Sequence, residues 1–77
     1  MKATNALKKL TKAGFVVTQS GNHYSAQAGR NVIDFHQQGE DIICIRVRSV
    51  NDRDDVMRDY SAGTRCDNLS QAIHLAA

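Results

Sequence analysis

Three closely spaced glycine turns constrain the fold of this chain more than any other feature. Gly21-Asn22 and Gly29-Arg30 are two-residue hairpin signals, and Gln38-Gly39-Glu40 is a third turn, of three residues. The short segments between these turns are rich in β-branched and aromatic residues, which favour strands. The sequence therefore predicts a meander of antiparallel strands.

The turns also predict which residues pair, because a two-residue loop leaves its flanking residues opposite each other. The first turn pairs Ser20 with His23, and the second pairs His23 with His36. The third turn predicts that Phe35 lies opposite Ile43. A slip of one residue would turn a strand over, so registers that agree support one another.

All three registers place the large apolar side chains on one face of the sheet. In the third hairpin this also sets Ile33 opposite Ile45. The inner face is predicted to carry Phe15, Val17, Tyr24, Ala26, Ile33, Phe35, Ile43, Ile45 and Val47. The outer face is predicted to carry Val16, Thr18, His23, Ser25, Gln27, Val32, Asp34, His36, Ile42, Cys44, Arg46 and Arg48.

A helix is predicted at each end of the meander. Apolar residues recur at helical spacing near Thr4–Ala13, and Thr4 or Asn5 can cap this helix. The last helix starts near Asn68, with Gln71 three residues on in a capping-box pattern. The expected fold is α+β in the order α-β-β-β-β-α, with a four-stranded antiparallel sheet and both helices packed on one face.

The length and composition indicate one domain over residues 1–77. The 77 residues are 42% apolar and 23% charged, as in a globular protein. No apolar run reaches the roughly 18–20 residues that span a bilayer, and no apolar signal region follows Lys2. A cytoplasmic location without membrane association is expected.

The cysteines and histidines do not form a recognisable metal motif. Cys44 and Cys66 are predicted to be free thiols, because the cytoplasm is reducing. Zinc sites normally take four Cys or His ligands in close pairs. Neither the cysteines nor His23, His36 and His74 are so paired, and no metal or cofactor is expected.

Basic side chains are concentrated in the first half of the chain. Residues 1–38 have a net charge of +4 and residues 39–77 a net charge of −2. A basic patch attracts phosphate, and arginine can hold it through two hydrogen bonds. The nucleic-acid-binding candidates are Lys8, Lys9, Lys12, Arg30, Arg46 and Arg48.

His23 and His36 are the candidate catalytic residues. Their predicted pairing places them on the outer face with Cβ atoms about 5 Å apart. One neutral and one charged histidine can act as general base and general acid in cleaving RNA or DNA. Arg46 and Arg48 would hold the phosphate. The alternative is an exposed polar pair without chemistry.

The stretch LKKLTKAGF, from Leu7 to Phe15, followed by Gly21-Asn22-His23-Tyr24, resembles the start of HicA-type toxins. These are small ribonucleases on a double-stranded-RNA-binding-like fold, with a catalytic histidine in a Gly-Ser-His-type turn. The resemblance covers roughly the first 36 residues and implies that His23 is catalytic. Asn22 replaces the usual serine, no proline precedes His36, and an acidic loop replaces the basic stretch before the last helix.

Aspartate and arginine alternate in the segment that follows the fourth strand. These charges could pair within the segment, or they could form a contact loop with Met57 and Tyr60 as anchors for a protein partner. The protein-contact candidates are Asp52, Asp54, Asp55, Met57, Asp59 and Tyr60.

The sequence favours a small non-enzymatic binding or inhibitory protein that occupies a host protein or nucleic-acid surface. Its size is typical of phage and mobile-element accessory proteins, such as anti-CRISPR and anti-restriction proteins. A HicA-like ribonuclease and a nucleic-acid-binding module remain as alternatives. Val16, Val32 and Ile42 predict an apolar strip on the outer face, and so a possible homodimer through it.

Overall fold

A computed structural model describes residues 1–49 and 63–76. The elements are α1 (Ala3–Lys12), β1 (Val16–Ser20), β2 (His23–Ala28), β3 (Asn31–Gln38), β4 (Asp41–Ser49), β5 (Thr64–Arg65) and α2 (Leu69–Ala76). The strands form one antiparallel sheet in the order β1-β2-β3-β4-β5. The α+β prediction is confirmed, but the described sheet has five strands rather than four. The two-residue β5 is too short to leave a periodic pattern in the sequence.

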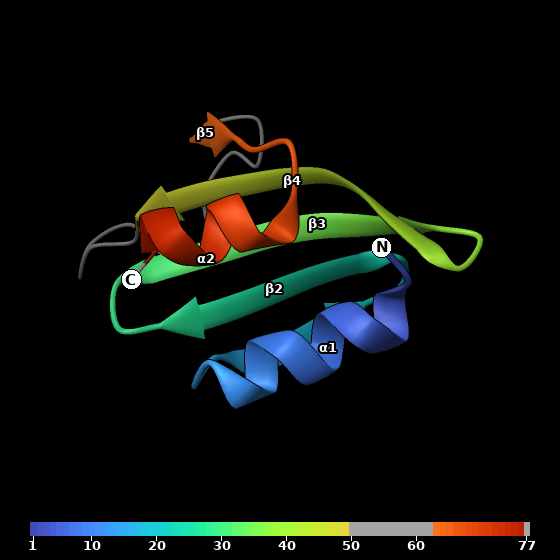
Figure 1. Cartoon of the computed structure of the whole chain (residues 1–77), viewed down its shortest axis with the longest axis horizontal. Coiled ribbons are helices and arrows are strands. Elements are labelled where there is room, and N and C mark those ends of the chain that lie inside the picture. Colours follow the sequence, from blue (N-terminus) through green and yellow to red (C-terminus); the bar gives the residue numbers. More distant parts are fainter. Residues whose placement is uncertain (50–62, 77) are drawn as a thin grey trace.

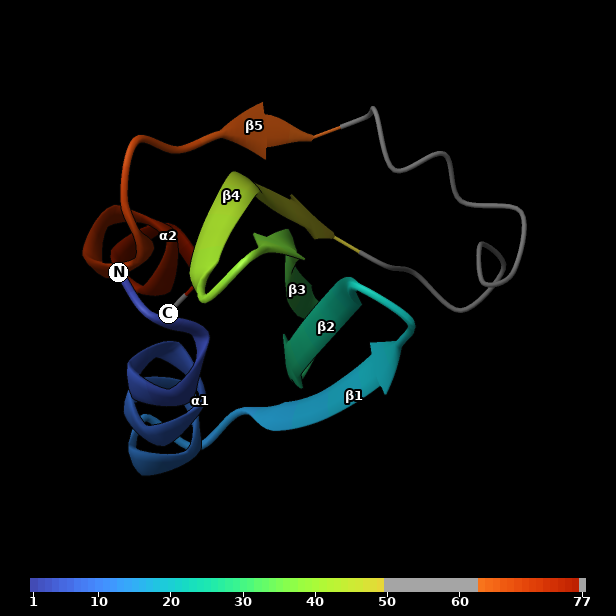
Figure 2. The same cartoon turned by 90° about the vertical axis from the view of Figure 1, so that its right-hand side faces the viewer.

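The two helices lie on the same side of the sheet (Figure 2). The helix α1 packs mainly on β1. The helix α2 packs on β3 and β4 (Figure 1). The face toward the helices is called the inner face below, and the opposite face is the outer face. No helix in the two described ranges is long and apolar enough to cross a membrane.

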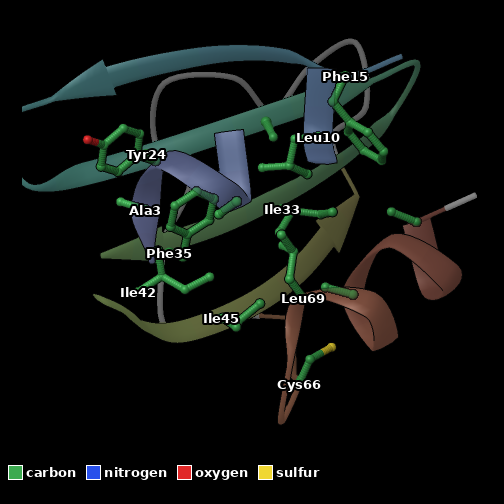
Figure 3. Packing of buried hydrophobic residues seen from close by; sticks show 14 residues of the cluster. Ala3, Leu10, Phe15, Tyr24, Ile33, Phe35, Ile42, Ile45, Cys66 and Leu69 are labelled. Carbon is green, nitrogen blue, oxygen red and sulfur yellow. The ribbon is translucent and has the colours of Figure 1, made fainter. Parts of the chain in front are cut away.

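The hydrophobic core fills the space between the inner face and the helices (Figure 3). Its largest fully buried side chains are Leu10, Ile33, Phe35 and Leu69. Tyr24 stacks on Phe35, with ring centroids 5.1 Å apart. Burying such a side chain contributes about 1.5–3 kcal/mol to stability, so this small cluster holds both layers together.

The first two predicted registers are confirmed. Ser20 faces His23 across β1 and β2, and His23 faces His36 across β2 and β3. The glycines Gly21 and Gly29 of these turns have φ angles of 59° and 61°. Glycine adopts this left-handed region without steric cost, which is why the turns could be located from the sequence.

The third predicted register was wrong. The loop is the two-residue Gly39-Glu40, and Ile33 faces Val47 rather than Ile45. A register shift in the middle of β3 separates the two halves of this hairpin. The sequence-based register therefore differs from the structure by one residue near the turn and by two residues beyond the shift.

A β-bulge at Cys44 causes this shift. Phe35 lies opposite both Cys44 and Ile45, and Cys44 has a φ of 56°. The extra residue reverses the alternation along β4, so that Ile42 and Ile45 are only 8% and 7% exposed. Ile43, predicted to lie inside, is 38% exposed, and Ile42, predicted to lie outside, belongs to the core.

The start of α1 is held by backbone rather than by a capping side chain. Neither Thr4 nor Asn5 caps the helix, which begins at Ala3. The Ala3 N–H donates instead to the Glu40 carbonyl at 2.7 Å. The turn between β3 and β4 thus supplies the acceptor that a side chain was predicted to supply.

The start of α2 follows the predicted capping box closely. The Gln71 N–H donates to Asn68 Oδ1 at 2.8 Å, and the Asp67 N–H donates to Gln71 Oε1 at 2.9 Å. The first bond occupies a backbone donor that the helix leaves free at its first turn, and the second ties the Gln71 side chain back to the residue before the cap. The apolar stripe of this helix then faces the core through Leu69 and Ala72.

Replacing Cys44 with glycine is expected to raise the free energy of unfolding by about 1 kcal/mol, because a residue with a Cβ atom is strained at a left-handed φ. The matched change Ile43→Gly should lower it by at least about 0.5–1 kcal/mol, since glycine weakens a regular strand. Urea unfolding measures both. A similar fall in the free energy of unfolding for both variants would contradict a bulge at Cys44.

Candidate functional site

Asp34 is a carboxylate buried on the outer face of the sheet. It lies on β3, the middle strand, and is 3% exposed. Ser25 of β2 donates its hydroxyl to Asp34 Oδ1 at 2.8 Å, and Arg48 Nε of β4 donates to Oδ2 at 2.5 Å. A buried carboxylate is costly without such partners, so both neighbouring strands stabilise it.

His23 lies beside this carboxylate, directly after the Gly21-Asn22 turn. Its side chain is 17% exposed, and its buried Nε2 lies 3.5 Å from Asp34 Oδ1. The exposed His36 faces it across the hairpin, with ring centroids 5.0 Å apart in an edge-to-face arrangement. The predicted pairing of the two histidines is therefore confirmed, and the structure adds Asp34 to it.

Burial lowers the pKa of His23 below its ordinary value of 6.5. The Asp34 carboxylate acts in the opposite direction, while His36 and Arg48 add to the lowering. The imidazole is thus neutral at pH 7 and able to accept a proton. If it keeps its own proton on Nε2, toward Asp34, then Nδ1 is the basic atom.

The six predicted nucleic-acid-binding residues do not share one surface. They are Lys8, Lys9, Lys12, Arg30, Arg46 and Arg48. The three lysines lie on α1, across the sheet from the two arginines of β4, and Arg30 is exposed in the β2–β3 turn. Lys9 Nζ donates to the Ser70 hydroxyl of α2 at 2.5 Å. Only the β4 arginines therefore belong to the candidate site.

Arg65 is a basic residue of this site that the sequence did not single out. It pairs in register with Arg46, so both lie on the outer face, and it is exposed. Together with Arg48, they make the β4–β5 side of the outer face basic. No sequence signal could have found Arg65, because its position depends on a strand of two residues.

The predicted apolar strip does not form on the outer face, and for Ile42 the bulge is the reason. Val16 is 69% exposed, but Val32 is only 3% exposed and Ile42 lies in the core. Ile43 takes a place on the outer face instead. The exposed apolar side chains of this face are thus separated rather than continuous.

A shallow hollow of about 300 Å³ lies on the outer face over β1 and β2. Its lining includes Val16, Thr18, Ser25 and Gln27. Small-molecule pockets usually measure roughly 300–1,000 Å³ and enclose most of the ligand. This hollow is at the lower limit, so the outer face suits contact with a macromolecule better than capture of a small ligand.

Both cysteines are free thiols, as predicted. Cys44 is exposed and Cys66 is buried. Burial raises the pKa of the Cys66 thiol, and the neighbouring Asp67 raises it further. Within residues 1–49 and 63–76, no group of three or more His, Cys, Asp or Glu side chains is placed to hold a metal ion.

The acidic segment predicted as a contact loop lies outside the described residues. Its candidates are Asp52, Asp54, Asp55, Met57, Asp59 and Tyr60. The candidate site is therefore built from the outer face alone.

Comparisons with known proteins give no further guide to the role of this face. No protein-family model, no curated protein and no solved structure matches the chain. Function is accordingly argued from the geometry of the outer face.

The free energy of unfolding is expected to fall as the pH drops below about 6.5, because His23 binds a proton less readily in the folded chain than in the unfolded one. Its contribution is complete above that pH and is lost as the pH falls toward the lowered pKa. Denaturant unfolding between pH 5 and 7.5 should show a shallower slope for His23→Gln. The exposed His74→Gln should keep the slope of the parent, and an unchanged slope in His23→Gln would contradict the assignment.

Proposed function

We propose that the protein is a small non-enzymatic binding protein that occupies a macromolecular surface with the outer face of its sheet. The observation that carries this proposal is the network around Asp34. Ser25 and Arg48 bind Asp34, and His23 lies against it, so these groups hold one another. A face fixed in this way loses little conformational freedom when it binds a partner.

Exposed apolar side chains flank the polar centre of this face. Val16 lies on β1 and Ile43 on β4, with 69% and 38% exposure. Contact surfaces commonly combine apolar side chains with polar groups that set orientation. Both residues are therefore suited to direct contact with a partner.

The charge of the outer face suits an anionic partner. Among its described residues, Arg46, Arg48 and Arg65 are basic and Asp34 and Asp41 are acidic, which leaves an excess of positive charge. A positive surface steers negatively charged molecules toward it. The partner that fits is an acidic host-protein surface or a nucleic-acid backbone, and a phage or mobile-element inhibitor of host defence is the role by analogy of size.

Val16→Glu and Ile43→Glu are each expected to weaken partner binding at least 10-fold, because a carboxylate then opposes an anionic surface. Leu75→Glu is the matched control, since Leu75 is 49% exposed on α2. Host extract is passed over each immobilised variant, and bound protein and nucleic acid are quantified. The partner is retained by the parent and the control and lost by both outer-face variants. If these variants retain everything that the parent binds, the proposal fails.

A ribonuclease is the second candidate, favoured by the grouping of His23, Asp34 and His36. A neutral His23 can take the proton of a ribose 2′-hydroxyl, which then attacks the phosphorus. A protonated His36 can give a proton to the departing 5′-oxygen, and Arg46 can hold the phosphate. The resemblance to HicA-type toxins assigns the catalytic role to the same His23.

His23→Ala is expected to reduce cleavage of single-stranded or structured RNA by the purified protein at least 100-fold, because a general base contributes about 10²–10⁴ to the rate. His74→Ala is the control and should cleave like the parent. Labelled RNA fragments resolved on a gel provide the measurement. An inactive parent, or undiminished cleavage by His23→Ala, excludes this candidate.

A further inference from the structure

The strand β1 forms the longer edge of the described sheet. The sheet ends at β1 on one side and at β5 on the other, and these strands have five and two residues. An edge strand presents backbone N–H and C=O groups that a further strand can bind. The edge at β1 is therefore the longer template for pairing.

The β1–β2 register determines which backbone groups of β1 face outward. Ser20 and His23 flank a two-residue turn and so form a hydrogen-bonded pair. Such pairs alternate along an antiparallel ladder. Ser20 and Thr18 direct their backbone groups toward β2, whereas Val17 and Gln19 direct theirs away from the sheet.

The sequence of β1 does not carry the features that keep edge strands apart. Its five residues, VVTQS, include no charge and no proline. Natural edges commonly use lysine, proline or a bulge to prevent pairing. Two valines and a threonine favour the extended conformation instead.

The flank of α1 above this edge is also uncharged. Lys9 points toward α2, where its Nζ binds Ser70. At 100° per residue, Thr4, Leu7 and Thr11 lie roughly opposite Lys9 on the helix. The helix α1 covers the β1 end of the sheet, and α2 covers the β3–β4 side (Figure 2). The uncharged flank of α1 therefore points away from α2, on the side of the open β1 edge.

We propose that two copies of this chain associate through their β1 strands and form one continuous antiparallel sheet. Thr18 lies on the two-fold axis, and Val17 of each copy pairs with Gln19 of the other, which exchanges their outward hydrogen bonds. A second copy is the favoured occupant because the outward groups of Val17 and Gln19 lie on either side of Thr18, so the edge is complementary to itself across a two-fold axis. The uncharged strand and helix flank provide one without like-charge repulsion.

This arrangement differs from the homodimer through the outer face that the apolar strip predicted. Pairing at the edge leaves both outer faces open and joins them side by side. The edge dimer does not depend on the proposed function, because none of its contacts uses Asp34 or its partners.

Light scattering during gel filtration tests the dimer. The parent is expected to show twice the 8.5 kDa of one chain at about 100 μM. Thr18→Lys should weaken association at least 10-fold, since it places two lysines together at the axis. Thr64→Lys, on the opposite edge strand β5, is the matched control and should remain dimeric.

Gln19→Pro is the second variant, because it removes an outward N–H while leaving the ladder to β2 intact. Circular dichroism verifies that each variant is folded. A folded Gln19→Pro monomer is the expected result. A monomeric parent at about 100 μM, or a dimer that persists in both folded β1 variants, overturns the proposal.

Discussion

The extra residue that β4 places opposite Phe35 determines which side chains reach each face. In a regular strand, Ile42 would share a face with Arg46 and Arg48, so burying the isoleucine would bury both arginines. The bulge at Cys44 reverses the alternation between them. One strand can therefore bury both Ile42 and Ile45 while Arg46 and Arg48 stay on the outer face.

Most of the fold could be predicted because its turns carry glycine. Gly21 and Gly29 occupy left-handed positions, and both of their hairpin registers were predicted correctly. The bulge gave no such signal, since the residue at its left-handed position is Cys44. The short β5 was missed for a different reason, because two residues cannot establish a period.

The candidate site could be predicted only where it depended on the correct registers. The pairing of His23 with His36 follows from the position of the second turn, and the same pair is present in the structure. The contact of Arg48 with Asp34 depends on the β3–β4 register, so the sequence could not locate it. The burial of Asp34 was missed with it, because an aspartate in an outer-face position is ordinarily exposed.

The ion pair of Asp34 and Arg48 also discriminates between alternative alignments of β3 and β4. A shift of two residues keeps every side chain on its own face, so the hydrophobic pattern cannot distinguish the alignments. A shift of two residues in the direction of the register predicted from the sequence would take Arg48 away from Asp34 and leave Cys44 opposite the buried carboxylate. A buried ion pair adds little net stability, but separating it costs about 3–5 kcal/mol. Its contribution is thus mainly to the uniqueness of the fold, as a penalty on the misaligned hairpin.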